Sequence, residues 1–281
     1  MDENRQTGSE LPGDVSRPLR GKRILVTRTK AQSEAITTQL ESLGATVVHC
    51  PTIEIIPPSS WEPLDDAIAR INEYNWLVFT SSNAVRYFFA RLNVAYDKRD
   101  IALGSQRICA IGPATAAAIT EEGAPVHVTA ADSVGEGALQ AIIEAAGGDQ
   151  NLKGLRILLP RARAAREFLP AALRNLGAHV DAVEAYRTIK PKIDSDNIFR
   201  LFTESSIDAV TFTSSSTVKN FAELAGLTDL SDLLSGIVVA CIGPVTADTA
   251  AAHGLKQVVQ PAEFNSSALV DALVAAIGSE S

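Results

Sequence analysis

The amino-acid sequence predicts an α/β protein built from two doubly wound, parallel-sheet α/β/α lobes. Apolar strands alternate with helix-compatible runs along the chain, and each strand ends in a short polar turn. The second half of the chain also repeats turns of the first half. RICAIGPAT at 107–115 returns as VVACIGPVT at 238–246, and a turn that occurs twice indicates a duplicated unit.

Composition narrows the class of protein. The chain has 281 residues, 46% of them hydrophobic, which is enough for two modest domains. Its net charge of −8 argues against nucleic acid as a main partner. No apolar run has the length of a membrane span and the start lacks a signal-peptide core, so we expect a cytoplasmic protein with no membrane partner. Residues 1–20 are polar and contain Pro and Gly, which predicts a disordered tail.

The cysteines and histidines do not have the spacing of metal ligands. Cys50, Cys109 and Cys241 lie in apolar runs, and the four histidines form no HxxxH pair. We therefore expect buried thiols and no metal site.

The first type of unit is a strand, a helix and a second strand. It begins with a strand at 24–27, turns at Arg28, continues as an amphipathic helix up to Gly44, and ends in a strand at 46–49. This order predicts a parallel pair with a right-handed crossover. The segment that starts at Gly154 repeats the order, with Arg161 in the place of Arg28.

The second type of unit is an apolar strand that ends in Phe-Thr-Ser-Ser. Ser81 and Ser82 follow the first such strand, and Ser214 and Ser215 follow the second. Hydroxyls at the start of a helix act as caps. A cap on a helix that points toward a cleft can also bind a ligand in that cleft.

The third type of unit contains the Gly-Pro turn. Thr115 and Thr246 stand at the start of helices of small residues that Gly123 and Gly254 close. We expect the threonine hydroxyls and the unpaired N–H groups of the helix start to face the space above the strand end, which suits an anion. A purely structural turn explains either copy taken alone.

All of these polar residues lie at carboxyl ends of predicted strands, where doubly wound folds bind ligands. Arg28, Arg161, Arg163 and Arg166 follow strands of the first type, and Arg86 lies in the first turns of a helix. Arginine forks bind carboxylates, so the group predicts a site for a polyanion, with surface ion pairs as the alternative for any one of them. The sequence has no Gly-rich or P-loop nucleotide motif and no GxSxG elbow.

Two domain arrangements fit this order of units. A simple tandem would divide the chain at Gly147–Gln150, which is rich in turn residues. Extended Pro-bearing tracts at about 52–59 and 187–194 instead resemble two strands of a hinge. This crossed arrangement gives lobe 1 residues 21–53 and 190–281, and lobe 2 residues 54–189.

Tyr186, in VEAYRT, ends the second strand of the repeated first unit. A structural role explains this position equally well, because an aromatic residue at the boundary of the core can pack its ring inside and expose its hydroxyl to water. A phenol also supplies a proton or a hydrogen bond without a charge, which suits a reaction that loses hydroxide.

The motifs ILVTR, VFTSSNAVR, AIGPAT, ILLPRA, VEAYRT, TFTSSSTV and CIGPVT occur in the order found in uroporphyrinogen-III synthase, and the chain from Gly21 onward resembles that family. The resemblance implies two lobes joined by a two-stranded hinge, and so favours the crossed arrangement. It also implies a monomeric hydro-lyase that needs no cofactor. Such an enzyme converts the linear tetrapyrrole hydroxymethylbilane to uroporphyrinogen III, with loss of water and inversion of the last pyrrole ring through a spiro intermediate.

The resemblance further implies roles for single residues. Tyr186 matches the tyrosine of the family and is the candidate catalytic residue. The candidate substrate-binding residues are the matching positions and their neighbours: Arg28, Ser81, Ser82, Arg86, Thr115, Arg161, Ser214, Ser215 and Thr246. The small-molecule substrate is the expected partner, together with transient contact with the enzyme that makes it. Two other classes stay open: a two-lobed sensor that binds a tetrapyrrole or another anion without converting it, and a phosphosugar or nucleotide transferase, which the missing phosphate loop disfavours.

Overall fold

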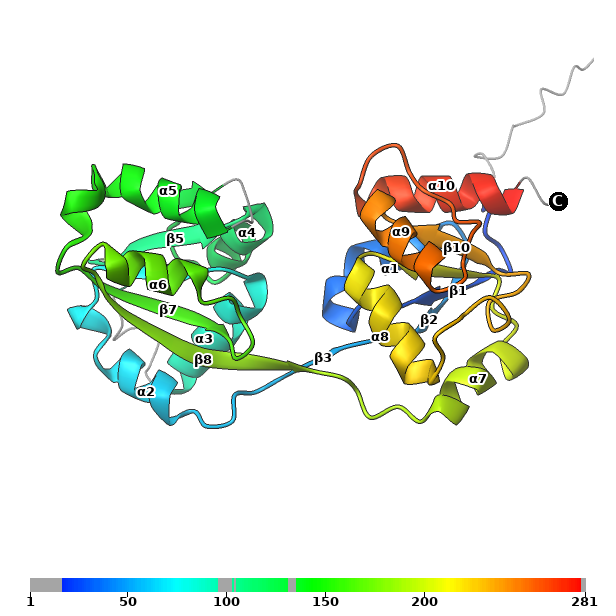
Figure 1. Ribbon diagram of the computed structural model, residues 1–281, viewed down its shortest axis with the longest axis horizontal. Coiled ribbons are helices and arrows are strands. Elements are labelled where there is room, and N and C mark those ends of the chain that lie inside the picture. The colour runs from blue at the N-terminus through cyan, green and yellow to red at the C-terminus, as the bar shows by residue number, and fades with distance from the viewer. Residues whose placement is uncertain (1–16, 96–102, 104, 131–134, 279–281) are drawn as a thin grey trace, which may run out of the picture. The chain divides into compact units, whose positions relative to one another are not determined.

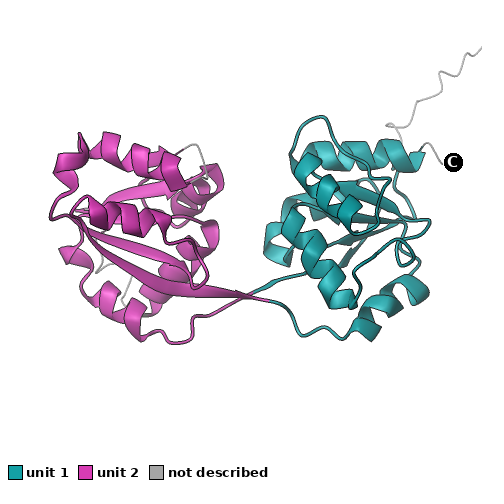
Figure 2. Cartoon of the chain, viewed as in Figure 1, with its two compact units in different colours: residues 1–54, 190–281 teal, residues 55–189 magenta. Residues whose placement is uncertain are grey.

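The computed structural model describes residues 17–95, 103, 105–130 and 135–278 (Figure 1). The chain folds into two compact units (Figure 2). Unit 1 contains the chain up to Glu54 and again from Lys190, and unit 2 contains Ile55–Ile189. Residues 147–150 lie inside unit 2, so the tandem arrangement is wrong. That the tracts around the two crossings act as a hinge stays a prediction.

The start of the described chain corrects one expectation. Residues 17–20, which we placed in a disordered tail, form a turn in which Leu19 is fully buried. The backbone N–H of Leu19 donates to the carbonyl of Leu43 at 3.0 Å, and its side chain joins the core under α1 (Glu34–Ser42). An apolar side chain within a polar stretch therefore fixes this end of the chain. The rest of the expected tail, residues 1–16, lies outside the described residues.

Unit 1 contains a four-stranded parallel sheet in the order β10-β9-β1-β2. Its strands are β1 (Arg23–Val26), β2 (Thr46–His49), β9 (Ala209–Phe212) and β10 (Val238–Cys241). All four residues of β9 are buried, as expected for a parallel strand covered on both faces. β1 pairs with β9, which in turn pairs with β10, so the first unit of the chain lies in one sheet with the second copies of the other two units.

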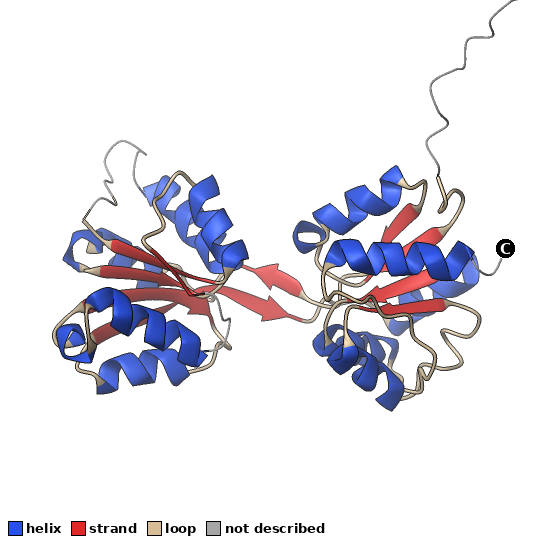
Figure 3. Cartoon of the chain, turned by 90° about the horizontal axis from the view of Figure 1, so that it is seen from above, coloured by secondary structure: helices blue, strands red, loops and turns tan. Residues whose placement is uncertain are grey.

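Helices cover both faces of the unit 1 sheet (Figure 3). On one face, α1 and α10 (Ser266–Gly278) pack against Ile24 and Val26. On the other face, Leu25 lies in the core with α7 (Ser195–Glu204), α8 (Ser215–Ala225) and α9 (Pro244–Ala252). The alternation follows from the two-residue period of a strand.

Unit 2 contains a six-stranded sheet in the order β3-β8-β7-β4-β5-β6. Its strands are β3 (Glu54–Ile56), β4 (Trp76–Phe79), β5 (Arg107–Ile111), β6 (Val128–Ala130), β7 (Arg156–Ala162) and β8 (His179–Ile189). The pairs from β8 to β6 are parallel. One face is covered by α2 (Glu62–Ala69), α3 (Ser82–Ala95) and α4 (Pro113–Glu121), and the other by α5 (Gly135–Ala146) and α6 (Phe168–Asn175). Short 3-10 turns lie at Lys30–Gln32, Ile71–Glu73 and Asp149–Leu152.

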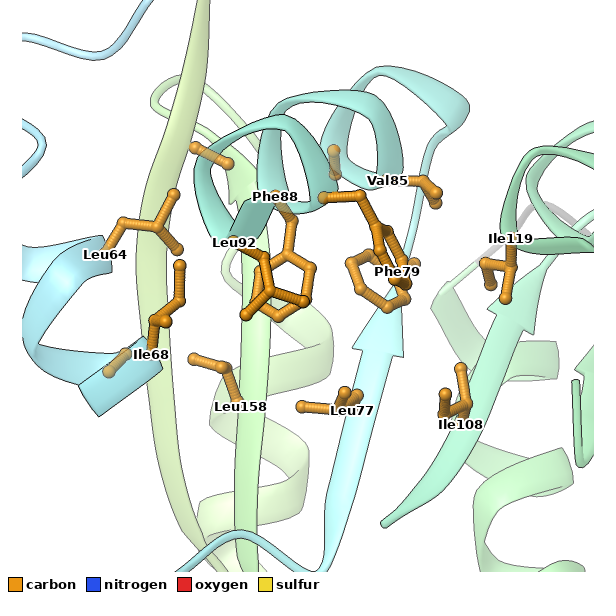
Figure 4. Close-up of a cluster of buried hydrophobic side chains, with 14 of the residues drawn as sticks. Leu64, Ile68, Leu77, Phe79, Val85, Phe88, Leu92, Ile108, Ile119 and Leu158 are labelled. Atoms are coloured by element: carbon orange, nitrogen blue, oxygen red, sulfur yellow. The ribbon is translucent and has the colours of Figure 1, made fainter. Parts of the chain in front are cut away.

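The face of unit 2 under α3 has an aromatic core (Figure 4). Phe79 of β4 and Phe88 of α3 are fully buried and meet edge to face, with ring centroids 5.3 Å apart. Leu77 and Leu158 complete the packing from β4 and β7. Edge-to-face pairs add to the hydrophobic burial of both rings.

Each sheet has one position where the chain reverses its direction of winding. In unit 1, β1 leads into α1 on one face, whereas its neighbour β9 leads into α8 on the other. In unit 2, β4 leads into α3 and its neighbour β7 leads into α6 on the opposite face. The loops after these strand pairs diverge, and such a switch point leaves a crevice at the carboxyl edge of the sheet.

The core assignment predicts the stability of two variants of α3. Phe88→Ala removes a fully buried ring and leaves a cavity, so we expect unit 2 to lose about 3–5 kcal/mol of unfolding free energy, measured by urea denaturation. Val94, on the same helix, is 75% exposed and provides the control. Val94→Ala should change stability by less than about 0.5 kcal/mol. Equal losses in the two variants would contradict this packing.

Candidate active site

The switch point of unit 2 holds Ser81, the residue that begins the turn into α3. Its Oγ accepts the N–H of Ala84 at 3.2 Å, which confirms the predicted helix cap. The same oxygen lies 3.1 Å from the hydroxyl of Tyr186. The structure therefore brings two of the predicted site residues into direct contact, although they are far apart in the sequence.

Tyr186 does not end its strand, as the sequence suggested, because β8 continues to Ile189. The pairing of β7 with β8 shifts at this point: Arg161 is opposite Glu184, and Ala162 is opposite Tyr186. Ala185 is thus the extra residue of a β-bulge, and both Ala185 and Tyr186 lie in the core cluster on the α3 face. A regular strand would send consecutive side chains to opposite faces, so the bulge turns Tyr186 toward Ser81.

An aromatic stack supports the Tyr186 ring, which is only 7% exposed. Tyr87 of α3 stacks on it with centroids 5.9 Å apart, and Trp61 stacks on Tyr87 at 6.3 Å. The guanidinium of Arg91 lies 5.1 Å above Trp61 and binds Asp65 through two nitrogens, at 2.5 and 2.6 Å. The hydrogen bond from Arg91 lowers the pKa of Asp65. The ring of Tyr186 is therefore fixed by aromatic packing, and its hydroxyl is in hydrogen-bond contact with Ser81.

Arg161, at the end of β7, is buried, and its side chain is only 7% exposed. Its Nη1 lies 2.7 Å from Oε1 of Glu167, and its Nη2 donates to the carbonyl of Ala165. The other predicted arginines of this edge, Arg86, Arg163 and Arg166, are exposed.

A pocket of about 470 Å³ opens beside Arg161 within unit 2. Thr80, which directly precedes Ser81, forms one wall, and Ile111 and Leu159 lie at the ends of the neighbouring strands. Phe168 and Leu169 at the start of α6 close the opposite side. The pocket thus lies at the carboxyl edge of the sheet, next to the switch point.

The two threonines of the Gly-Pro turns are largely buried. Thr115 is 3% exposed and Thr246 is 5% exposed, and both belong to the first turn of a helix, α4 and α9. Their N–H groups donate to the carbonyls of Gly112 and Gly243, at 3.2 and 3.1 Å. The N–H groups of the two threonines are therefore not free, whereas the direction of their hydroxyls stays a prediction. Their role in substrate binding stays a prediction.

The switch point of unit 1 lies between Arg28, after β1, and Ser214, after β9. Ser214 caps α8 in a capping box with Thr217, which confirms the predicted cap. Ser215 donates to the carbonyl of Val245 at 3.0 Å and so ties the start of α8 to that of α9. Burial lowers the pKa of Arg28, and among the described residues no carboxylate pairs with it. Its guanidinium keeps its charge and can bind an anion.

The comparisons with known proteins agree with this arrangement. The family model described as "Uroporphyrinogen-III synthase HemD" matches residues 34–271. The uroporphyrinogen-III synthase of Synechococcus elongatus is 35% identical over 239 residues, which cover 84% of this chain and 88% of that protein.

The chain belongs to the uroporphyrinogen-III synthase family.

This family membership makes the protein a hydro-lyase of porphyrin biosynthesis. The uroporphyrinogen-III synthase of Chlorobaculum parvum is 28% identical, with 91% of this chain and 99% of that protein covered. Solved structures of uroporphyrinogen-III synthases have the same fold. The Helicobacter pylori enzyme has a TM-score of 0.58 at 17% identity, covering 91% of this chain and 99% of that one, and a Thermus thermophilus mutant has 0.56 at 21%, covering 92% and 100%.

Sequence reasoning missed several residues of this candidate site. Tyr87, Thr80, Glu167 and Phe168 contact or flank the predicted residues, yet we did not single them out. The one available signal was Glu167, an isolated carboxylate in the loop that follows Arg161. Within the described residues, no His, Cys, Asp or Glu cluster could hold a metal ion. The described helices include none with the length and apolar character of a membrane span.

The three cysteines are free and buried, as expected. Burial raises the pKa of Cys50 to about 11 and those of Cys109 and Cys241 to about 12. At pH 8 the folded protein therefore holds less thiolate than free cysteine does. We expect negligible alkylation by iodoacetamide in the folded state and complete alkylation in guanidinium, measured by mass spectrometry. Rapid labelling of the folded protein would contradict the burial of these thiols.

Proposed function

We propose that this protein converts hydroxymethylbilane to uroporphyrinogen III. The observation that carries the proposal is the Tyr186 hydroxyl, held by Ser81 at the switch point of unit 2. The carboxyl edge of the same sheet also carries a pocket with a buried arginine. A phenol that is buried by its ring and polar at its tip can assist the loss of a hydroxyl group without adding a charge. Family membership supplies the reaction class.

The polar residues suit a substrate that carries many carboxylates. Arg28 in unit 1 and Arg161 in unit 2 follow equivalent strands, and each provides a fork for a carboxylate. We assign Arg86, Ser82, Ser214, Ser215, Thr115 and Thr246 to further substrate contacts.

The proposed mechanism needs a direction for the Tyr186 proton. Ser81 accepts the N–H of Ala84, and in this mechanism it donates its own hydroxyl proton to the oxygen of Tyr186, 3.1 Å away. The phenol proton then points to the substrate. Tyr186 gives this proton to the departing hydroxyl of hydroxymethylbilane, the C–O bond breaks, and water leaves. The resulting phenolate keeps the hydrogen bond from Ser81.

Loss of water leaves a delocalised azafulvenium cation on the bilane. The substituted α-carbon of the last ring attacks it and forms the spiro intermediate, which fragments and closes again with that ring inverted. The α-proton lost on closure returns to the Tyr186 phenolate, so proton and charge balance over one turnover. Unassisted closure gives the non-inverted isomer, and the main task of the protein is therefore to fix the geometry of the bound chain.

The reaction product tests the proposal. Freshly generated hydroxymethylbilane is added to the protein, and the oxidised porphyrin isomers are separated by chromatography. The type III isomer is the expected product. If only the type I isomer forms while the protein still binds tetrapyrrole, the non-catalytic sensor is the better account.

Variants of three residues test the assignment of Tyr186. Tyr186→Phe removes the proton donor and keeps the ring, so we expect kcat to fall by about a hundredfold. Ser81→Ala removes one hydrogen bond to the phenol, and we expect a fall of about fivefold, equivalent to about 1 kcal/mol. Steady-state formation of type III product measures both.

Tyr74 provides the matched control. It is another buried tyrosine of unit 2, but its hydroxyl donates to Asp181 at 2.6 Å, away from the switch point. Tyr74→Phe should lower stability and leave kcat within about twofold, because it removes one hydrogen bond outside the site. A hundredfold loss in Tyr74→Phe, or none in Tyr186→Phe, would rule out the proposed role.

A further inference from the structure

The pocket of unit 2 combines apolar walls with one buried cation. Ile111, Leu159, Leu169 and Pro170 line it with aliphatic surface. Arg161 provides the buried guanidinium, and the exposed Arg166 also belongs to the lining. Its volume of about 470 Å³ is in the range of pockets that bind small molecules. A flat apolar ring that carries a carboxylate matches this lining.

The ion pair of Arg161 is asymmetric. The Arg161 side chain is 7% exposed, whereas its partner Glu167 is 68% exposed. Nη1 contacts Glu167 at 2.7 Å, yet it has no aligned hydrogen-bond acceptor among the described residues. A buried guanidinium needs an anion, and here an exposed side chain supplies it from the solvent side in an imperfect geometry.

The position of Glu167 allows its carboxylate to move away from Arg161. It is the residue before α6, and its second oxygen lies 3.9 Å from Arg174, an alternative cationic partner that is half exposed. Arg161 keeps its contact with the carbonyl of Ala165 in either case. Exchange of one carboxylate for another at Arg161 therefore leaves no charge without a partner.

The ring of Phe168 gives the opposite wall of the pocket a flat surface, which suits a flat ligand group. The ring of Phe168 packs directly on Gly135, where an added Cβ would lie 2.7 Å from Cδ1 of the ring. The absence of a side chain at Gly135 thus lets Phe168 stand as one wall. Phe168 is also 42% exposed, so its ring has surface that a ligand can cover.

We propose that this pocket is a subsite for one pyrrole ring of the substrate, in which a carboxylate arm of that ring replaces Glu167 on Arg161. Glu167 acts as a stand-in anion that holds the arginine until substrate arrives. The identity of the ring rests on the proposed function, whereas the exchange at Arg161 is a property of the pocket alone.

The test uses the full-length protein and a pyrrole that carries one acetate and one propionate arm, with its dimethyl ester as the neutral control. Affinity is measured by calorimetry, and the position of the probe by amide chemical shifts of Thr80, Ile111 and Leu169. Four proteins are compared: wild type, Glu167→Gln, Glu136→Gln and Arg161→Lys. Glu136 also lines the pocket but does not contact Arg161, so its variant removes the same charge without freeing the arginine.

We expect Glu167→Gln to bind the diacid about tenfold more tightly than wild type, because the competing carboxylate is gone. Glu136→Gln should change the affinity by less than about threefold, and Arg161→Lys should weaken it by about tenfold because a lysine loses the fork. The dimethyl ester should show no such differences.

Two results would overturn the subsite: an equal gain in Glu167→Gln and Glu136→Gln, or shifts that map away from the pocket. Circular dichroism checks that each variant is folded. If Glu167→Gln is not, Glu167→Asp replaces it, since the shorter arm loosens the same contact and should tighten binding by at least about threefold. The isomer produced by wild type is recorded in parallel, so failure of the synthase function and failure of the subsite are separate outcomes.

Discussion

The parallel pairing of β7 with β4 is the constraint on which the site depends. Because their following helices lie on opposite faces of the sheet, the two loops separate and leave a crevice at the strand ends. Thr80 and Ser81 follow β4 at this point, and Arg161 is the last residue but one of β7. A hydroxyl, a buried cation and an apolar pocket are thereby placed side by side without any long loop to position them. The β1 and β9 pair gives unit 1 the same plan, with Arg28 and Ser214 in equivalent places.

The β-bulge in β8 brings Tyr186, the candidate catalytic residue, to this switch point. Without the extra residue at Ala185, the alternation of the strand would place Tyr186 on the α6 face, away from Ser81. The stack of Tyr87 and Trp61 then fixes the ring plane, while Arg91 and Asp65 hold the far end of the stack. Rigid support of this kind suits a reaction whose outcome depends on geometry, since a mobile phenol would serve either mode of ring closure.

Most of the fold could be predicted because its signals are local. An apolar run followed by Thr-Ser-Ser or by Gly-Pro specifies a strand, a turn and a helix start within a few residues, so Ser81 and Ser214 were placed correctly as caps. Tyr186 and Thr115 were harder, because their surroundings depend on partners that are distant in the chain. The bulge is a mismatch between two strands, and neither strand encodes it alone. The burial of Thr115 depends on how closely α4 lies against the sheet, and the Glu167 contact depends on the path of a loop.

The discontinuous make-up of unit 1 has a consequence for biogenesis. Thr27 donates to the carbonyl of Thr211 at 2.7 Å, and this buried bond joins segments 184 residues apart. During translation, β1 and β2 leave the ribosome long before β9 and β10 exist, whereas unit 2 is one uninterrupted segment. Unit 2 can therefore fold before the sheet of unit 1 is complete. Until β9 has been made, β1 has an unpaired apolar edge, and such an edge is prone to pairing with other chains.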